Sequence, residues 1–596
     1  MAGATTLTTG VWHHVAGVFD GAELRVYVDG VLDGSKASTF APGAGTASLK
    51  VGARGDDATN TFSGLIDEAR VTAGVVYTAG FTPAAQLAVG AGTRGLWRFD
   101  GQTGNDSTTN QHHGALVGGA GFSTDVPGGA VPTPTPTPVP TPTPTPTIDP
   151  RSQVGEWTSP LSWPMVAIHT SVLPNGKVMA FENGNRSYVW DPTTNAFTHF
   201  PMSTSNIFCG GHAFLSDGRL MVTGGHIQSR IGENDANIFD YRTNTWTVAE
   251  PMNDDRWYPT NVTLPNGEML VLSGSVDTNF TNDLPQVWKT TGGWRDLTGA
   301  VLRVPESRSL YPWMFVASNG KVFNSGPDRI TRFLDTNGTG AWSQVGFTNY
   351  QGSRDEGSSV MYDVDKVMIV GGGESPPTNT AEVIDLSAGS PTWRNVSPMA
   401  FPRRHHTAVI LPDGQVLVTG GSRGSGFNNE SEPVFAAEMW NPANERWSTM
   451  ASAQVTRVYH STAMLLPDGR VLSGGGGGEG GGTSYLNAEI YSPPYLFKGA
   501  RPTISNAPES IGYGERFFVA TPNAAGITGV TWVRLPSVTH AYDMNQRFNR
   551  LSFTQAAGGL NVTAPANGNL CPPGHYMLFI HDGNGVPSVA KIVRIG

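Results

Sequence analysis

The sequence is poor in cysteine and in charge, and it contains no long hydrophobic run. Two of its 596 residues are cysteine, Cys209 and Cys571, which allow one disulfide at most and exclude a disulfide scaffold. No apolar run approaches the roughly 18 residues of a membrane-spanning helix. A net charge of −10 without any basic stripe argues against a nucleic-acid partner. The start, MAGATTLTTGVWHHV, has no basic or apolar stretch typical of a signal peptide.

Glycine and proline are abundant instead. The chain has 75 glycines and 43 prolines, with few long helical patterns, a composition typical of all-β proteins with many turns. At 596 residues it is too long for one hydrophobic core, so we expect about three domains.

A short apolar strand, a tight turn and a second strand that ends in glycines recur seven times, as in HHTAVILPDGQVLVTGG and HSTAMLLPDGRVLSGGGG. The period of roughly 42 to 55 residues is that of kelch-type propeller blades, which predicts a seven-bladed β-propeller. The turns fall at Asn175, Asp217, Asn266, Asn319, Asp365, Asp413 and Asp468.

The residues eight positions before these turns include most of those that look chemical. They are Ala167, Cys209, Tyr258, Tyr311, Gly357, His405 and His460. Because propeller blades are related by rotation about one axis, these positions are expected to form a ring around the channel. Cys209 and Tyr258 would then be neighbours on adjacent blades, with Tyr459 and His460 on the closing blade.

Low-complexity sequence separates the domains. Residues 131–150 contain a Pro-Thr linker, whose alternating prolines favour an extended polyproline II conformation. We therefore expect an N-terminal module over residues 1–130, a catalytic propeller over 151–498 and a C-terminal domain over 499–596. The last has short strands and the size of an immunoglobulin-like sandwich.

The N-terminal module has alternating strands with Asp-Gly turns, as in WHHVAGVFDGAELRVYVDGVLDGS. Its sequence resembles the laminin-G-like, concanavalin-type jelly-roll family. The order of the matching segments indicates that the module is truncated or permuted. The resemblance implies either a glycan- or surface-binding module or a spacer without a ligand. Since the chain begins inside this domain, we also expect its start to be truncated.

Phenols and imidazoles that converge on a polar axis suit a tetragonal nitrogen and oxygen site, which favours Cu(II). Zinc is a competing choice, but no HExxH motif or thiolate pair supports it. The remaining alternative is that tyrosine and histidine side chains only fill the channel with hydrogen-bonded groups.

Four segments resemble the copper radical oxidase family, which includes galactose oxidase and glyoxal oxidase. They are SNIFCGGH, RWYPTNVTLPNG, TRVYHSTAMLLPDGRVLSGGGGG and VTHAYDMNQR, and the resemblance extends over about residues 155–596. It implies copper as cofactor and a thioether between Cys209 and Tyr258, which would hold a radical. By the same resemblance Cys209, Tyr258 and Tyr459 are the catalytic residues, and Tyr258, Tyr459, His460 and His540 are the copper ligands.

Other residues are weighed against this set. His575 and His581 are rivals for His540, and Cys571 is expected to be a free thiol. Phe427 matches a residue that lines the galactose oxidase pocket, and Tyr311, Trp313 and His212 are further pocket candidates. His212 can equally cap its strand, and packing is favoured for Tyr311 and His405.

One departure concerns a tryptophan that stacks over the cysteine–tyrosine unit in galactose oxidase. The matching position here is Val276, so the shield is absent or comes from another aromatic residue. The candidates are Trp257, Tyr311, Trp313 and Trp294. Without that tryptophan a hexose is a less suitable substrate, because a sugar ring typically packs on such a face.

The resemblance implies a secreted, monomeric oxidase. Its substrate is a small primary alcohol or aldehyde, in the manner of glyoxal oxidase rather than galactose oxidase. Dioxygen would be the acceptor, with hydrogen peroxide as a product. The alternative from another class is a non-catalytic kelch scaffold that binds glycans.

Overall fold

The computed structural model describes most of the chain, with gaps that are largest near the N-terminus. Described are residues 4–38, 49–52, 62–84, 86–90, 92–99, 103–110, 112–116, 120–123, 149–184, 186–202, 204–302, 310–373, 375–478 and 482–596. The Pro-Thr stretch up to residue 148 lies outside them. The chain divides into two units, residues 1–144 and 145–596.

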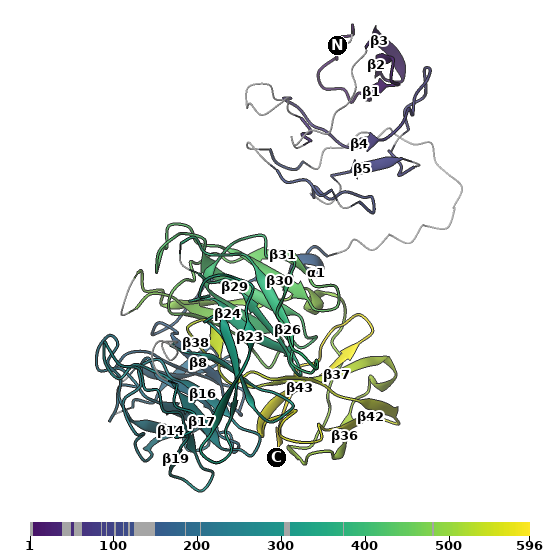
Figure 1. Ribbon diagram of the computed structural model, residues 1–596. Coiled ribbons are helices and arrows are strands. Elements are labelled where there is room, and N and C mark those ends of the chain that lie inside the picture. The colour runs from purple at the N-terminus through teal and green to yellow at the C-terminus, as the bar shows by residue number, and fades with distance from the viewer. Residues whose placement is uncertain are drawn as a thin grey trace. The chain divides into compact units, whose positions relative to one another are not determined.

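The first unit contains small antiparallel sheets (Figure 1). One sheet has the order β1 (Val15–Phe19), β2 (Glu23–Val28), β3 (Val31–Ala37), and β4 (Ala69–Thr72) pairs with β5 (Thr93–Trp97). Tyr27 is buried beside Phe81, whose ring stacks on Tyr77 at a centroid distance of 3.7 Å. This aromatic group is the packed part of the β1–β3 sheet.

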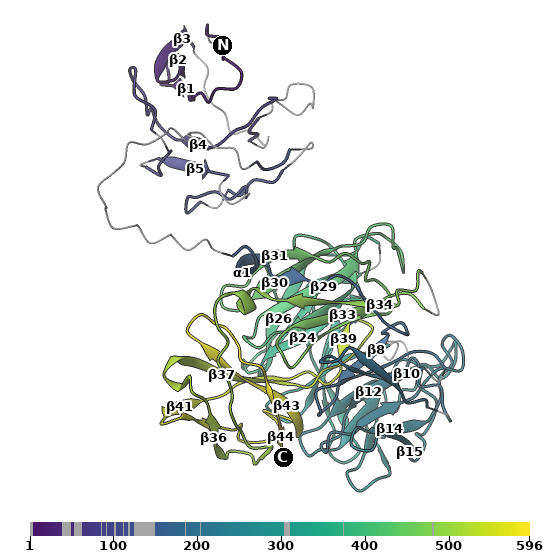
Figure 2. The same ribbon diagram turned by 180° about the vertical axis from the view of Figure 1, so that it is seen from behind.

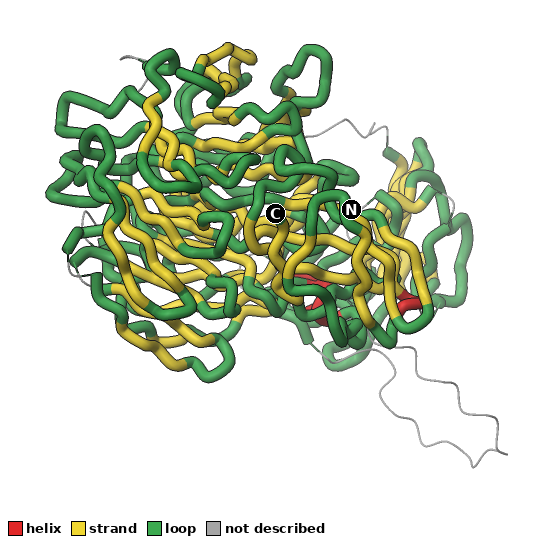
Figure 3. The backbone as a smooth tube through the Cα atoms, turned by 90° about the horizontal axis from the view of Figure 1, so that it is seen from below, coloured by secondary structure: helices red, strands yellow, loops and turns green. Residues whose placement is uncertain are grey.

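In the described part of the second unit the regular structure is mainly strand, and helix is confined to short segments (Figure 3). These are α1 (Arg151–Val154) and the 3₁₀ turns η2 (Pro494–Phe497) and η3 (Ala524–Gly526). Within the described residues, no helix is long and apolar enough to cross a membrane.

Seven sheets follow one another along the described part of this unit, in the colour order of Figures 1 and 2. The first contains β8 (His169–Val172), β9 (Val178–Phe181), β10 (Ser187–Asp191) and β11 (Ala196–His199). The second and third contain β12 (Gly211–Phe214), β13 (Leu220–Thr223), β14 (Ala236–Asp240), β15 (Thr245–Val248) and β16 (Thr260–Thr263), β17 (Met269–Leu272), β18 (Gln286–Trp288), β19 (Trp294–Asp296). The fourth and fifth contain β20 (Trp313–Val316), β21 (Val322–Gly326), β22 (Ile330–Asp335), β23 (Ala341–Phe347) and β24 (Ser358–Asp363), β25 (Lys366–Val370), β26 (Ala381–Asp385), β27 (Arg394–Val396).

The last two of these sheets complete the series. The sixth contains β28 (Arg404–Ile410), β29 (Val416–Ser422), β30 (Ala436–Asn441) and β31 (Arg446–Ser452). The seventh contains β32 (Ser461–Leu465), β33 (Val471–Gly475) and β34 (Asn487–Ser492), and β34 also pairs with β6 (Glu156–Trp157) and β7 (Leu161–Ser162). The start of the unit thus completes its last sheet, and the first strands of neighbouring sheets, such as β28 and β32, contact one another.

The predicted turns form because their side chains and glycines suit them. In the turn after β28, the Asp413 carboxylate accepts a hydrogen bond from the Gln415 backbone at 3.0 Å, and Gly414 has a φ of 85°. This Asx arrangement and the positive φ favour aspartate or asparagine followed by glycine. The Asn175, Asp217, Asn266, Asn319 and Asp468 side chains accept the same bond from the residue two positions later.

The C-terminal strands form two more sheets. One has the order β35 (Ser510–Ile511), β44 (Lys591–Ile595), β43 (Gly574–Asp582), β37 (Ile527–Arg534), β40 (Phe548–Arg550), and the other β36 (Arg516–Ala520), β42 (Gly559–Thr563), β41 (Phe553–Ala556). Between β37 and β40 the chain leaves these sheets. There β38 (Ser537–Thr539) pairs with β8 and with β39 (Tyr542–Asp543), so that His540 lies at the tip of a hairpin among the first strands.

Candidate metal centre

Five of the seven predicted ring positions share one backbone conformation. Cys209, Tyr258, Tyr311, His405 and His460 have φ values between 47° and 67°, whereas Ala167 at the first sheet has no positive φ. The Tyr258 amide donates to the Cys209 carbonyl at 2.9 Å, and the Tyr311 amide donates to the Tyr258 carbonyl at 2.8 Å. Left-handed backbone at residues with side chains costs about 1–3 kcal/mol each and gathers at functional sites. Here it lets consecutive sheets join their ring residues directly.

In the fifth sheet Glu356 takes the ring position. The prediction of Gly357, which counted eight residues back from the turn at Asp365, is wrong by one residue. Glu356 has a φ of 58°, and its carbonyl accepts from the His405 amide at 2.6 Å. The reason is the hairpin between β24 and β25, in which Asp363 pairs directly with Lys366. Its turn is shorter than the others, which moves the count by one residue.

Buried arginines hold the ring segments in place. Arg403, two residues before His405, donates to the Gly420 carbonyl at 2.8 Å and pairs with Glu438 at 2.6 Å. Arg256, Arg354 and Arg457 make the same bond to the carbonyls of Ser273, Gly371 and Gly475. The glycines that end each second strand are needed for close approach, since a Cβ on Gly475 would lie 2.6 Å from the Ala167 carbonyl oxygen.

Four polar side chains from distant segments, those of Tyr258, Tyr459, His460 and His540, lie close together at this ring. The Tyr258 and Tyr459 hydroxyls are 2.5 Å apart, and His540 Nε2 is 2.7 Å from the Tyr258 hydroxyl. The His460 ring stacks on Tyr459 at a centroid distance of 3.8 Å and lies 4.8 Å from the His540 ring. All four side chains are buried.

The tautomers of both histidines follow from their hydrogen bonds. The Thr539 hydroxyl donates to the Ile168 carbonyl at 3.0 Å, so it accepts from His540 Nδ1 at 2.7 Å. His460 Nδ1 donates to the Gly477 carbonyl at 2.7 Å. Each imidazole therefore keeps a lone pair on Nε2, and that of His540 faces the Tyr258 hydroxyl.

This arrangement fits a metal ion. His460 Nε2 is buried and has no hydrogen-bond partner in the described part of the chain, a costly state for a polar atom unless a ligand fills it. Two imidazole nitrogens and two phenol oxygens form a donor set that suits Cu(II). The described residues contain no group of three or more His, Cys, Asp or Glu that could hold a metal, so the tyrosine oxygens are essential here.

Burial sets the protonation of these ligands. Burial lowers the pKa of His460 to about 4 and that of His540 well below its ordinary value, so both stay neutral and able to bind a metal near neutral pH. Burial, together with Tyr459 and Cys209, raises the pKa of Tyr258 well above its ordinary value. A nearby cation is the means by which such a phenol can lose its proton.

The Tyr258 ring lies between two aromatic side chains. Trp257 stacks on it with a centroid distance of 3.6 Å and an interplanar angle of 7°, and Tyr311 lies at 4.4 Å and 24°. The backbone explains why Trp257 reaches this place, because it forms a two-way bridge with Ser275, next to Val276. Of the four candidate shields, Trp257 is thus parallel to Tyr258, while Trp294 packs against Trp288 instead.

A histidine pair lies under Cys209, and the sequence interpretation missed one member. The Cys209 amide donates to His169 Nε2 at 3.1 Å, His169 Nδ1 therefore donates to His212 Nε2 at 3.1 Å, and His212 Nδ1 donates to Ser537 at 2.6 Å. His212 is thus joined to His169 and not to the four converging side chains. His169 stands in HTSVLPNG, at the first repeat, where no blade-to-blade comparison singles it out.

The remaining candidates from the sequence lie at different distances from the four converging side chains. The Phe427 ring meets Tyr459 edge-on at 4.8 Å, and Trp313 is buried in β20 against Gly326. His581 bonds to Thr531 at 2.8 Å in the C-terminal sheets, where His575 also lies. The two cysteines form no disulfide, and burial raises the pKa of Cys571 to about 12.

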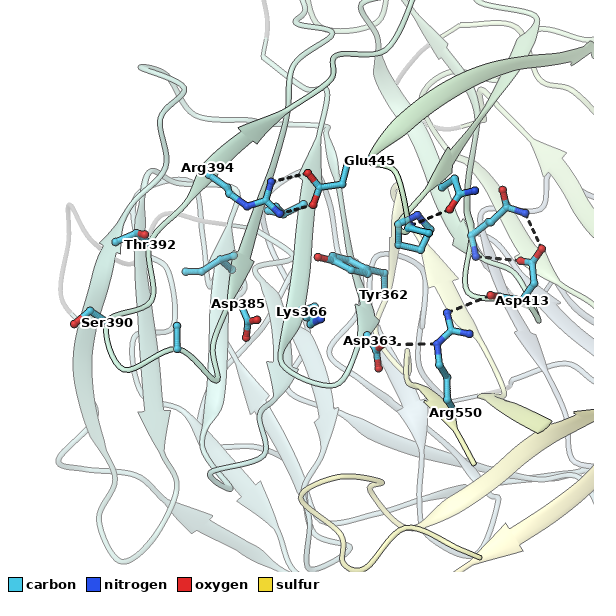
Figure 4. Close-up of a pocket in the computed structure, with 17 residues that line it drawn as sticks. Tyr362, Asp363, Lys366, Asp385, Ser390, Thr392, Arg394, Asp413, Glu445 and Arg550 are labelled. Carbon is cyan, nitrogen blue, oxygen red and sulfur yellow. Dashed lines mark hydrogen bonds and ion pairs between the residues drawn. The ribbon is translucent and has the colours of Figure 1, made fainter. Parts of the chain in front are cut away.

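A polar pocket of about 690 Å³ lies away from the ring, between the fifth and sixth sheets (Figure 4). Arg394 and Glu445 form an ion pair across it, with one contact of 2.7 Å. Arg550 reaches it from β40 and lies 3.9 Å from Asp363. None of its lining residues belongs to the ring.

Comparison with known proteins agrees with the site. The family described as "Glyoxal oxidase N-terminus" matches residues 168–339 and 357–495, more than half of the chain. The chain belongs to the glyoxal oxidase and galactose oxidase family. The description "Galactose oxidase-like, Early set domain" matches residues 501–595, and "Concanavalin A-like lectin/glucanases superfamily" matches residues 1–79. The predicted family resemblances of both parts are therefore confirmed.

Individual relatives in this family cover about two thirds to three quarters of this chain. A galactose oxidase of Gibberella zeae is 28% identical over 493 residues, 75% of this chain and 71% of the relative. The aldehyde oxidase GLOX1 of Arabidopsis thaliana is 29% identical over 449 residues, 66% of this chain and 72% of the relative. A solved structure titled as a novel fungal alcohol oxidase of the AA5 family in complex with copper has a TM-score of 0.69 at 25% identity. It covers 74% of this chain and 99% of its own.

Proposed function

We propose that this chain is a copper radical oxidase that oxidises a small primary alcohol or aldehyde with dioxygen. The observation that carries the proposal is the convergence of Tyr258, Tyr459 and His540, with hydroxyl and Nε2 atoms 2.5–2.7 Å apart, beside the unpartnered Nε2 of His460. A channel filled only for packing has no need to leave that nitrogen buried and unpaired.

These four residues would hold copper, and Cys209 would be joined to the Tyr258 ring by a thioether. Copper, when bound, supplies a Lewis acid for the substrate oxygen and one redox equivalent. Tyr459 takes the hydroxyl proton of the substrate as general base. The second equivalent comes from the oxidised Tyr258–Cys209 unit, whose next neighbour on the ring is Tyr311.

The reaction balances as two coupled half-reactions. The alcohol carbon loses a C–H bond and the oxygen loses its O–H bond, so that two electrons and two protons leave and an aldehyde forms. Dioxygen accepts the same two electrons and two protons and becomes hydrogen peroxide. For an aldehyde substrate, the hydrated form loses them in the same way and gives a carboxylic acid.

Glyoxal-like substrates suit this site better than galactose. Val276, which is half-buried, stands at the position of the galactose oxidase tryptophan. The ring that stacks on Tyr258 here is that of Trp257, the residue directly before it in the chain. The names of the relatives include both galactose oxidase and aldehyde oxidases, and the family description that matches the ring is that of glyoxal oxidase. A small substrate does not require the broad aromatic face on which a sugar packs.

We further propose that the seven sheets are blades of a kelch-type propeller and that residues 499–596 are an immunoglobulin-like sandwich. Support comes from the consecutive sheets, from the closure of the last by β6, and from the contacts between first strands. The first unit would be a laminin-G-like module that binds a glycan or cell-surface ligand, on a secreted and monomeric enzyme.

Peroxide release tests the function. The copper-loaded protein is assayed under oxygen with glyoxal, methylglyoxal, glycerol, galactose and benzyl alcohol, and the Tyr459→Phe variant serves as a control that retains three ligands. Turnover on glyoxal or methylglyoxal that Tyr459→Phe lacks supports the proposal. Full copper occupancy without peroxide from any substrate would leave the alternative, a non-catalytic kelch scaffold that binds glycans.

A further inference from the structure

Glu356 places a carboxylate at the height of the proposed copper ligands. It shares their left-handed backbone, with a φ of 58°, and its carbonyl is bonded to the next ring residue, His405, at 2.6 Å. Tyr258 is bonded to Tyr311 in the same way at 2.8 Å. Equivalent backbone positions direct the side chains alike, so Glu356 extends into the channel as Tyr258 does.

His405 connects this carboxylate to Phe427. Its Nδ1 lies 3.2 Å from Glu356 Oε2, and its Nε2 donates to the Phe427 carbonyl at 2.5 Å. Both ring nitrogens of His405 thus face an oxygen acceptor, and the imidazole bridges the carboxylate and the Phe427 carbonyl. The Phe427 ring in turn meets the Tyr459 ring at 4.8 Å.

The carboxylate is the more exposed member of this pair. The Glu356 side chain is 20% exposed, whereas that of His405 is 3% exposed. Burial opposes ionisation of Glu356, but His405 and Arg404 hold the pKa of this carboxyl below its ordinary value. The His405 ring that contacts Glu356 lies at a centroid distance of 5.3 Å from the Tyr459 ring, so the carboxylate is one side chain away from Tyr459. Since Oε2 faces His405, Oε1 is the oxygen that can accept a bond from a substrate.

We propose that Glu356 determines substrate specificity by accepting a hydrogen bond from a second hydroxyl group, either on the carbon that is oxidised or on the carbon next to it. Vicinal diols and hydrated aldehydes carry such a hydroxyl, whereas simple alcohols do not. A substrate carboxylate would face a like charge and be disfavoured. The inference rests on the proposed function and narrows it to polyhydroxyl or hydrated aldehyde substrates.

The experiment compares ethylene glycol with 1-propanol, and glycolate as the anion, in wild type, Glu356→Gln and Glu356→Met. Methionine keeps the length of the side chain without an oxygen acceptor, and glutamine keeps a neutral acceptor. We expect Glu356→Met to lower the ratio of kcat/KM for glycol over propanol about 10-fold, which corresponds to about 1.4 kcal/mol. Most of this change should appear in KM. Glu356→Gln should lower the ratio less and should raise kcat/KM for glycolate.

Copper content and Glu250→Gln, at an exposed glutamate, serve as controls. An equal loss on glycol and propanol in both variants would overturn the inference, because Glu356 would then only support His405. If wild type turns over neither these substrates nor glyoxal and methylglyoxal, the proposed function fails instead. Binding then decides the inference: glycol should perturb the Cu(II) EPR spectrum of wild type at lower concentration than propanol, and Glu356→Met should abolish that difference.

Discussion

The indole ring of Trp257 lies parallel to the phenol ring of Tyr258, with centroids 3.6 Å apart and an interplanar angle of 7°. The indole nitrogen donates to His226 Nδ1 at 3.0 Å, which fixes the ring in this orientation. A neighbour residue along the chain thus covers one face of the proposed radical site. Tyr311 covers the other face at 4.4 Å.

Trp257→Leu should therefore shorten the lifetime of a Tyr258 radical, because the stacked face becomes open to water. An aromatic pair contributes about 0.5–1.5 kcal/mol, which predicts that the radical decays about 2- to 10-fold faster in Trp257→Leu than in wild type. The decay rate of Trp257→Phe should lie between those of wild type and Trp257→Leu. The measurement is the decay of the oxidised protein's optical and EPR signals. Trp294→Phe, at a surface pair with Trp288, is the control, and an unchanged decay in Trp257→Leu would exclude a shielding role.

Cys209 and Tyr258 should be covalently joined in copper-matured protein. They occupy consecutive ring positions, and the Tyr258 amide donates to the Cys209 carbonyl at 2.9 Å. Peptide mass spectrometry should find their tryptic fragments linked, two hydrogens lighter than their sum and stable to thiol reductants. Fragments that separate on reduction would contradict the thioether.

The matched cysteine variants test the role of this bond. Cys209→Ser should retain most copper, because sulfur is not a proposed ligand, and should lose most oxidase activity. Cys571→Ser should change neither, since Cys571 is buried in the separate core of the C-terminal sheets.

His540→Ala should lower copper affinity by at least the roughly 10- to 100-fold that loss of an outer-shell partner costs. His540 Nε2 lies 2.7 Å from the Tyr258 hydroxyl, and alanine has no nitrogen to replace its lone pair. Copper content after dialysis against a competing chelator measures the change. His575→Ala, in β43, is the control, and equal losses in both variants would show that only the stability of the C-terminal sheets matters.

Asp543 should make stability depend on pH. Its carboxylate accepts from the Ser537 and Asn545 amides in the hairpin that carries His540, and burial raises its pKa to about 7 from an ordinary 3.8. Between about pH 4 and pH 7 the folded protein therefore holds a proton that the unfolded chain has released. The free energy of unfolding falls as pH rises through this window.

Asp543→Asn keeps an oxygen acceptor and cannot ionise, so this part of the pH dependence should disappear. Relative to wild type, the variant should gain a few degrees in Tm between pH 4 and pH 8, as measured by scanning calorimetry. A constant difference between the two proteins across this range would show that Asp543 does not titrate there.

The family resemblance and the repeats could be predicted from sequence because their causes are local. An aspartate or asparagine followed by glycine forms its turn with the amide two residues away, as Asp413 does with Gln415, and needs no distant partner. The alternation of apolar residues on either side of such turns predicts the strands for the same reason. Catalytic roles for Tyr258, Tyr459, His460 and His540 remain predictions that the geometry supports.

Tertiary structure alone decided which side chains meet. Glu356 takes the ring position because a shorter hairpin in its own sheet shifts the register, and its carbonyl then bonds to His405 of the next sheet. Trp257 stacks on Tyr258 because a backbone bridge to Ser275 holds it there, and His540 arrives through the pairing of β38 with β8. The sequence by itself determined the strands, the turns and the chemical groups, since these depend on neighbours within a few residues. The site depends on backbone bonds between segments up to several hundred residues apart, and only the folded chain brings those segments together.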